Sequence, residues 1–152
     1  MTDDDPFARY KQQEARRKTL AAELRLSTKA KLFDLLRAAG ITRVAVIFDG
    51  QGDSGQIEDI SAFSEANKPI KLPRKRLTIR TAKSDGSGAD ETTLPVQEAI
   101  EGLCYELLED KHEGWEINEG AYGEFVFDVA TGEITLTFNY RISDVETSTH
   151  TF

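Results

Sequence analysis

The amino-acid sequence predicts an α+β domain: a mostly antiparallel sheet, built as a meander plus a C-terminal hairpin, with helices packed on one face. Three observations predict this class. An amphipathic helical pattern covers residues 94–110, strand-like alternation covers residues 122–142, and no succession of βαβ units typical of a parallel sheet is present. The expected order of elements is α-α-β-β-β-α-β-β, in a chain of 152 residues, a length typical of one domain.

Two helices are expected at the N-terminus. Asp5 and Pro6 make a favourable helix start, and residues 6–26 are rich in helix formers but poor in apolar positions near their middle. We therefore expect residues 1–26 to form an N-terminal helical arm and residues 27–152 to form the single α+β domain.

The second helix is predicted to begin at Ser27 or Thr28, either of which can cap it, and to end at Gly40. Its core-facing stripe consists of Leu32, Phe33, Leu35 and Leu36. The β-branched run "ITRVAVIFD" follows at once and has the length and composition of a strand.

Three further segments precede the amphipathic helix. "QIEDISAF", residues 56–63, fits a strand or a short helix, and the turns on both sides favour a strand of a meander. "KPIKLPRKRLTIRT", residues 68–81, contains two prolines before its alternating part, which is typical of an edge strand. "AKSDGSGADETT", residues 82–93, is predicted to be a loop from its composition.

The amphipathic helix and the final hairpin are the best specified elements. The buried stripe of the helix is expected to contain Val96, Ala99, Ile100, Leu103 and Leu107, widened by Cys104 and Leu108. The hairpin consists of "YGEFVFDV" and "EITLTFNYRI", joined at "ATGE". Alternation places the apolar side chains of both strands on one buried side of the sheet, while the other side is at least partly hydrated.

Charge is divided sharply along the chain, whose net charge is −8. Residues 6–43 carry ten Lys/Arg against three Asp/Glu, residues 68–83 carry seven Lys/Arg and no acid, and residues 84–152 carry two bases and sixteen acids. Such patches complement one another within a fold or form an electrostatic docking surface. The acidic total, and the lack of interleaved aromatics in the basic stretch, argue against nucleic-acid binding.

A cytoplasmic location without membrane association is expected. The longest apolar run, "VAVIF", is far shorter than the roughly 20 residues that span a bilayer. The single Cys104 cannot form an internal disulfide and is predicted to be a buried, inert thiol. His112 and His150 are far apart in the sequence and no Cys/His cluster exists, so no metal site and no cofactor is predicted.

The stretch "GQGDSG", residues 50–55, overlaps three known motifs. "GDSG" surrounds the nucleophile of chymotrypsin-like proteases, whose all-β double barrel this helix-containing chain cannot form. "G-x-G-x-x-G" is the dinucleotide-binding spacing, but Asp49 and Asp53 would stand where a pyrophosphate must lie. Calcium-loop spacing also begins at Asp49, but Ser54 and Ile60 replace the required glycine and glutamate.

We therefore predict that "GQGDSG" is a tight turn between strands, in which Asp53 or Ser54 bonds to the turn backbone. A non-standard calcium site using Asp49, Asp53 and either Glu58 or Asp59 is the alternative that stays open.

The segment "KHEGWEINEGAYGEF", residues 111–125, gathers aromatic, carboxylate and histidine side chains in a connection rich in glycine. This composition suits a binding surface, although Trp115 could instead cap the core while the glycines make turns. No catalytic residue is assigned. The candidate binding surface consists of Asp53, Ser54, Glu58, His112, Trp115, Asn118, Glu119, Tyr122 and His150.

The stretches "FDGQGDSGQIEDI" and "GWEINEGAYGEFVFDVATGEITLTFNYR", with the terminal "HTF", resemble a family of small bacterial proteins of unknown function. The resemblance covers residues 28–60 and 94–152. It implies a bacterial cytosolic protein, associated with alphaproteobacteria and often with plasmids or other mobile regions, and it carries over no activity. The basic stretch 68–83 lies outside the shared motifs.

These observations favour a non-enzymatic interaction module, an accessory protein that binds a protein partner through an acidic face of sheet and loops. The N-terminal helix is expected to dock on a partner or on a second copy. The alternative is a small ligand- or metal-binding protein, or an enzyme, with its site between the GDSG and GWEINEGAYG loops. A third hypothesis is a nucleic-acid mimic or regulator, whose complexes would weaken steeply with salt.

Overall fold

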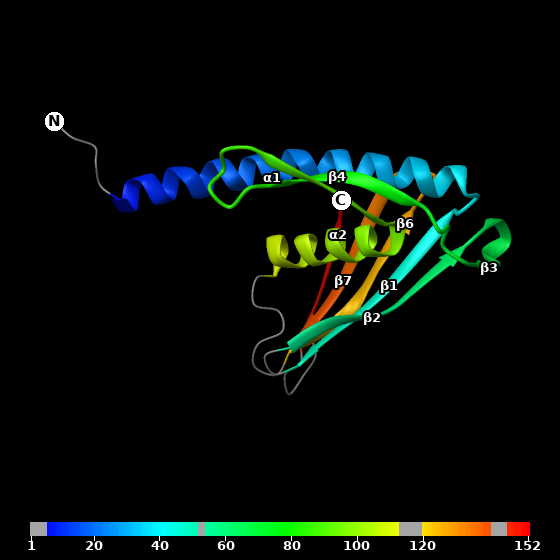
Figure 1. Ribbon diagram of the computed structural model, residues 1–152. Helices are drawn as coiled ribbons and strands as arrows, with labels where there is room; N and C mark the ends of the chain where they lie inside the picture. The colour runs from blue at the N-terminus through cyan, green and yellow to red at the C-terminus, as the bar shows by residue number, and fades with distance from the viewer. Residues whose placement is uncertain (1–5, 52–53, 113–119, 141–145) are drawn as a thin grey trace.

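The computed structural model describes residues 6–51, 54–112, 120–140 and 146–152. The elements of these residues are shown in Figure 1. They are α1 (Pro6–Ala38), β1 (Arg43–Gln51), β2 (Ser54–Phe63), the 3-10 helix η1 (Glu65–Asn67), β3 (Pro69–Ile70), β4 (Arg76–Ala82), β5 (Ala89–Pro95), α2 (Val96–Lys111), β6 (Ala121–Asp128), β7 (Glu133–Tyr140) and β8 (Glu146–Thr151). The predicted α+β class is confirmed.

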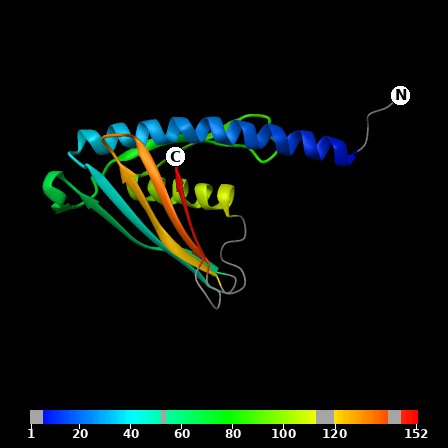
Figure 2. The same cartoon turned by 180° about the vertical axis from the view of Figure 1, so that it is seen from behind.

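Within the described residues, six strands form one antiparallel sheet in the order β3-β2-β1-β6-β7-β8, and β4 pairs with β5 as a separate ribbon. Both α1 and α2 lie on the same side of the large sheet, and the β4–β5 ribbon runs beside α1 (Figures 1 and 2). An ion pair of 3.8 Å between Arg25 of α1 and Asp110 of α2 joins the two helices. This arrangement, with the helices on one face of an antiparallel sheet, confirms the prediction.

The core lies between the large sheet and the two helices. Alternate residues of β1, β6 and β7 point into it, and the ring centroids of Phe33 on α1 and Phe127 on β6 are 5.9 Å apart. The predicted stripe of α2 is buried in full, with Cys104 and Leu108 beside it. The largest fully buried side chains include Phe48, Phe125, Phe127, Phe138, Leu32 and Leu36.

The prediction of two N-terminal helices is wrong, because α1 is one helix that runs through Ser27 and Thr28. No glycine or proline occurs between Pro6 and Gly40, so the backbone hydrogen bonds of the helix continue without a break. Ser27 and Thr28 therefore lie inside the helix and do not cap a new one. Gly40 ends the helix as predicted, at a φ of 77° that favours glycine. The expected boundary after residue 26 falls within this continuous helix and stays a prediction.

The N-terminal part of α1 projects beyond the sheet and α2 in both views (Figures 1 and 2). Phe7 and Tyr10 on this part are 61% and 62% exposed. Among the helices of the described residues, none is long and apolar enough to cross a membrane.

The described residues form three strands that the sequence did not predict. Residues 56–63 belong to β2, which confirms the strand interpretation of this segment. The loop predicted over residues 82–93 is wrong in its second half, where β5 pairs with β4. The described chain also contains the short β3 and the edge strand β8, neither of which was predicted. Strands β5 and β8 are rich in Thr, Asp and Glu and have no apolar alternation, so their pairing is not visible in local sequence.

Candidate functional site

One face of the six-stranded sheet is left uncovered by α1 and α2, which both pack on the other side (Figures 1 and 2). We call it the open face. Its residues alternate with the buried ones along each strand. They are Arg43, Ala45, Ile47 and Asp49 of β1, Gln56, Asp59, Ser61 and Phe63 of β2, Tyr122, Glu124, Val126 and Asp128 of β6, Glu133, Thr135, Thr137 and Asn139 of β7, and Thr147, Thr149 and Thr151 of β8.

The open face is acidic around an apolar centre. Ile47 is 43% exposed, and the strand register places Asp59 on one side of it and Glu124 on the other. The cation of this face, Arg43, lies with its guanidinium carbon 4.2 Å from the ring centroid of Phe63. The remaining carboxylates of the open face belong to Asp49, Asp128 and Glu133.

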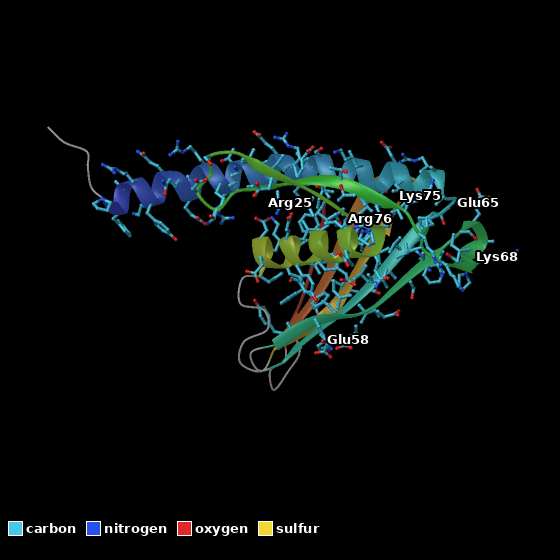
Figure 3. The ribbon with its side chains drawn as sticks, in the orientation of Figure 1. Arg25, Glu58, Glu65, Lys68, Lys75 and Arg76 are labelled. Atoms are coloured by element: carbon cyan, nitrogen blue, oxygen red, sulfur yellow. The ribbon has the colours of Figure 1, made fainter. Side chains whose placement is uncertain are left out.

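A β-bulge shapes the open face at Glu58, one of the predicted site residues. The register of β1 and β2 shifts between Ile47 and Phe48, so Glu58 is an extra residue on β2. Its carboxylate accepts a hydrogen bond of 3.1 Å from the side-chain amide of Gln56. Figure 3 shows Glu58 pointing away from α2. The bulge therefore adds an exposed carboxylate to the open face.

A tyrosine of α2 supports this bulge from the covered side. The backbone N–H of Ile57 donates a hydrogen bond of 2.9 Å to the hydroxyl oxygen of Tyr105. Ile57 precedes the extra residue, where the ladder between β1 and β2 is interrupted. The Tyr105 hydroxyl thus ties β2 to α2 directly beside the bulge.

Side-chain hydrogen bonds tie the open face together near β8. The amide of Asn139 donates to the backbone oxygen of Tyr122 at 3.3 Å, and its Oδ1 accepts from the hydroxyl of Thr147 at 2.5 Å. These two bonds cross three adjacent strands. The strand register pairs Tyr122, another predicted site residue, with Asp49 and Asn139, which places it on the open face.

The two histidines meet on the opposite, helix-covered face. His112 ends α2 and His150 is on β8, and their Nε2 atoms are 3.0 Å apart. The His112 ring lies parallel to that of Phe138, with centroids 3.7 Å apart. Its Nδ1 is 3.5 Å from the Tyr140 hydroxyl, and its Nε2 is 3.4 Å from the Ser148 hydroxyl. Stacking and these contacts fix the orientation of the imidazole.

The environment of His112 disfavours its charged form. Burial lowers the pKa of His112, and the positive charges of His150 and Lys111 lower it further. A neutral His112 can share a proton with His150 through their facing nitrogens, or both nitrogens can offer lone pairs to one ion. Within the described part of the chain, no three His, Cys, Asp or Glu residues form a group that could hold a metal ion.

The nine predicted site residues thus divide between two faces of the sheet. Glu58 and Tyr122 lie on the open face, and His112 and His150 lie together on the covered face. The other five predicted residues are Asp53, Trp115, Asn118 and Glu119, which are outside the described residues, and Ser54, of which only the backbone is described.

Sequence reasoning missed Tyr140 and Ser148 as neighbours of the histidine pair. A signal existed for Tyr140, since alternation places it on the same side of its strand as Phe138. Ser148 carried no signal, because β8 was not recognised as a strand that pairs with β7.

The stretch "GQGDSG" joins two strands of a hairpin. Gly50 pairs with Gly55 and Gln51 with Ser54, so β1 leads directly into antiparallel β2. The dinucleotide-binding arrangement requires a helix after the glycines, and β2 occupies that position. Cys104 is buried as predicted, and burial raises the pKa of its thiol well above the ordinary value, which keeps it protonated and inert.

A groove of about 730 Å³ opens between β2, the segment that leads into β4, and the first turn of α2. We call it the cationic groove, because Lys71, Arg74, Lys75 and Arg76 line it and no Asp or Glu is among its lining residues. Sequence reasoning noticed this basic stretch but placed it outside the shared motifs. The fold wraps it around a concave surface.

The fold and its surfaces together define a small α+β protein with an acidic open sheet face, a half-buried histidine pair and a cationic groove. Residues 24–152 match the model of a family described as "Family of unknown function (DUF6878)". The chain belongs to this family, which confirms the expected membership in a family without an assigned function. No curated protein and no solved structure matches the chain.

Proposed function

We propose that the protein is a non-enzymatic interaction module whose open face binds a basic segment of a protein partner. The observation that carries this proposal is the arrangement at the centre of the open face. There, the exposed side chain of Ile47 stands between the carboxylates of Asp59 and Glu124. An apolar centre with a polar rim is the usual arrangement of a protein-binding surface.

Charge complementarity specifies the partner. A segment with one apolar side chain flanked by Lys or Arg would place the apolar group on Ile47 and its cations on Asp59 and Glu124. The further carboxylates of the open face attract such a segment from a distance, which raises its association rate at low salt.

The test is affinity capture from a host lysate with three forms of the tagged protein, followed by titration of the captured partner. The first bait is unchanged, the second carries Asp59→Lys and Glu124→Lys, and the third carries Glu91→Lys and Glu98→Lys. The third is a matched control, because it makes the same charge change on exposed positions outside the open face.

We expect a partner that is retained by the unchanged and control baits, lost with the Asp59/Glu124 bait, and released progressively as salt is raised. A partner that binds all three baits equally would contradict the proposal. If duplex DNA competes with the open face for the partner, the acidic face acts as a nucleic-acid mimic, which is the third hypothesis from the sequence.

A second candidate function is the binding of a divalent transition metal by His112 and His150. Two facing Nε2 atoms 3.0 Å apart favour it, because imidazole nitrogens about 2.0–2.1 Å from a zinc ion lie at a similar mutual distance. Water would complete the coordination. Titration with Zn²⁺ or Ni²⁺ in a calorimeter tests it: binding should vanish in His150→Gln, and a titration that stays silent in the unchanged protein contradicts it.

The projecting end of α1 supports self-association or docking of the N-terminal helix, since it carries Phe7 and Tyr10 on an exposed surface. Size-exclusion chromatography with light scattering, on the full chain and on Phe7→Ser/Tyr10→Ser, measures this. An unchanged monomer in both cases would remove self-association.

We further infer that the protein is bacterial, is encoded in mobile regions of the genome, and acts in the cytoplasm. The sequence motifs support the first two, and the unpaired Cys104 thiol suits a reducing compartment. Fractionation of the host cell, with an antibody against the protein, tests the compartment.

A further inference from the structure

We propose that the cationic groove binds a small phosphorylated ligand of nucleotide size, separately from the partner proposed for the open face. The groove, with a volume of about 730 Å³, falls within the usual range of small-molecule sites, roughly 300–1,000 Å³. Four cationic residues and no acidic residue line it, in a chain whose net charge is −8. Its charge is thus opposite to that of the molecule as a whole.

The cations of the groove are available to a ligand. Among the described residues, Lys71, Arg74, Lys75 and Arg76 take part in no ion pair with a carboxylate. Arg76 donates to the neutral backbone oxygen of Thr93 at 3.3 Å. Clustered cations without counter-charges repel one another, and a bound anion would relieve this repulsion.

The backbone that carries these cations is fixed by its neighbours. The backbone N–H of Val96, at the start of α2, donates to the Lys75 carbonyl oxygen at 3.0 Å, so the cationic segment is fixed to the helix. Figure 3 shows Lys75 and Arg76 at the start of β4, close to that end of α2. Pro69, Pro73 and Pro95 also line the groove and restrict its backbone. A preformed backbone reduces the entropic cost of ordering on binding, which is then confined to the cationic side chains.

The lining indicates which class of anion fits. Arg74 and Arg76 supply planar guanidinium groups that match phosphate oxygens in a bidentate manner, and the lysines add point charges. Ile60, Ile70 and Leu72 line the groove as well, which gives an apolar surface for a ring or another uncharged group. A nucleotide combines both parts. A long nucleic acid would also approach the acidic parts of the molecule and be repelled.

The test is isothermal titration calorimetry of the full chain with ATP as the probe. Tripolyphosphate and adenosine are titrated separately, so that the phosphate and ring contributions are distinguished. The variant Arg74→Gln removes a groove cation. Arg80→Gln is its matched control, because it removes the same charge from an exposed position of β4 that does not line the groove. Both changes are at the surface, and circular dichroism verifies that each variant folds.

We expect ATP to bind saturably, more tightly than either tripolyphosphate or adenosine. Arg74→Gln should weaken binding by about tenfold to a hundredfold, the effect of losing one hydrogen-bonded charge, and Arg80→Gln should leave it within about twofold.

Three results would overturn the proposal. The first is no heat of binding with ATP or tripolyphosphate at millimolar concentration. The second is equal weakening by Arg74→Gln and Arg80→Gln, which would indicate unspecific attraction to the basic surface. The third is that a short single-stranded oligonucleotide binds far more tightly than ATP, which would identify the ligand of the groove as a nucleic acid instead of a small molecule. None of these results depends on whether the open face binds a protein.

Discussion

Replacing Tyr105 by phenylalanine is expected to destabilise the protein, because it removes the acceptor of the Ile57 N–H at the bulge. Tyr105→Phe keeps the ring and its packing, so the lost bond of 2.9 Å is the main change. Leaving a buried donor without its partner costs about 1–3 kcal/mol, and the half-buried Ile57 N–H is expected toward the lower end of this range. For a chain of this size, 1 kcal/mol shifts Tm by roughly 2–4 °C, so Tm should fall by about 2–12 °C.

The assay is thermal unfolding followed by circular dichroism, repeated with urea to obtain the free energy of unfolding. Tyr10→Phe is the control, since that side chain is 62% exposed on the projecting part of α1. Hydrogen exchange at the Ile57 amide gives an independent readout and should accelerate only in Tyr105→Phe. If the Tm of Tyr105→Phe is the same as that of the unchanged protein, water satisfies the Ile57 N–H and α2 does not hold the bulge.

Two further predictions concern glycine packing and pH. Gly123→Ala would place a Cβ 2.0 Å from the backbone oxygen of Thr137 and should lower the free energy of unfolding by about 1–3 kcal/mol or more. Gly102→Ala, with nothing within 4 Å in α2, should raise it by about 0.5–1 kcal/mol, and urea unfolding that ranks the two alanines otherwise contradicts the packing. Because the pKa of His112 is lowered by folding, the unfolded chain binds its proton more readily, so stability should fall as pH drops below 6.5. His112→Gln should reduce this loss in urea titrations at several pH values, and an unchanged loss would assign it to other groups.

The sequence predicted those elements whose period was visible locally. The stripe of α2 and the alternation of β6 and β7 were found because each buried side chain recurs at the spacing of its own backbone. Strands β5 and β8 were missed because their residues are polar, and pairing with a neighbour, rather than burial, makes them strands. The helix boundary at Ser27 was misplaced because a capping residue has no effect where the ladder continues through it.

The candidate site was predicted only in its composition. Both histidines were selected from the sequence, yet their contact depends on β8 pairing with β7 next to the end of α2, 38 residues away along the chain. Glu58 and Tyr122 were selected with them, although β-sheet alternation sends them to the other face. The positions of these residues along the sequence did not show that they lie on two different faces of the sheet.

Composition and periodicity by themselves determined the α+β class, the buried thiol of Cys104 and the division of charge along the chain. The tertiary structure decided where those charges lie. It placed acids around Ile47 on the face that lies opposite α1 and α2, and it curved the basic segment of Arg74 around a groove. The physical reason is that local sequence fixes backbone period and burial, whereas a surface is assembled from segments that meet only when distant strands pair.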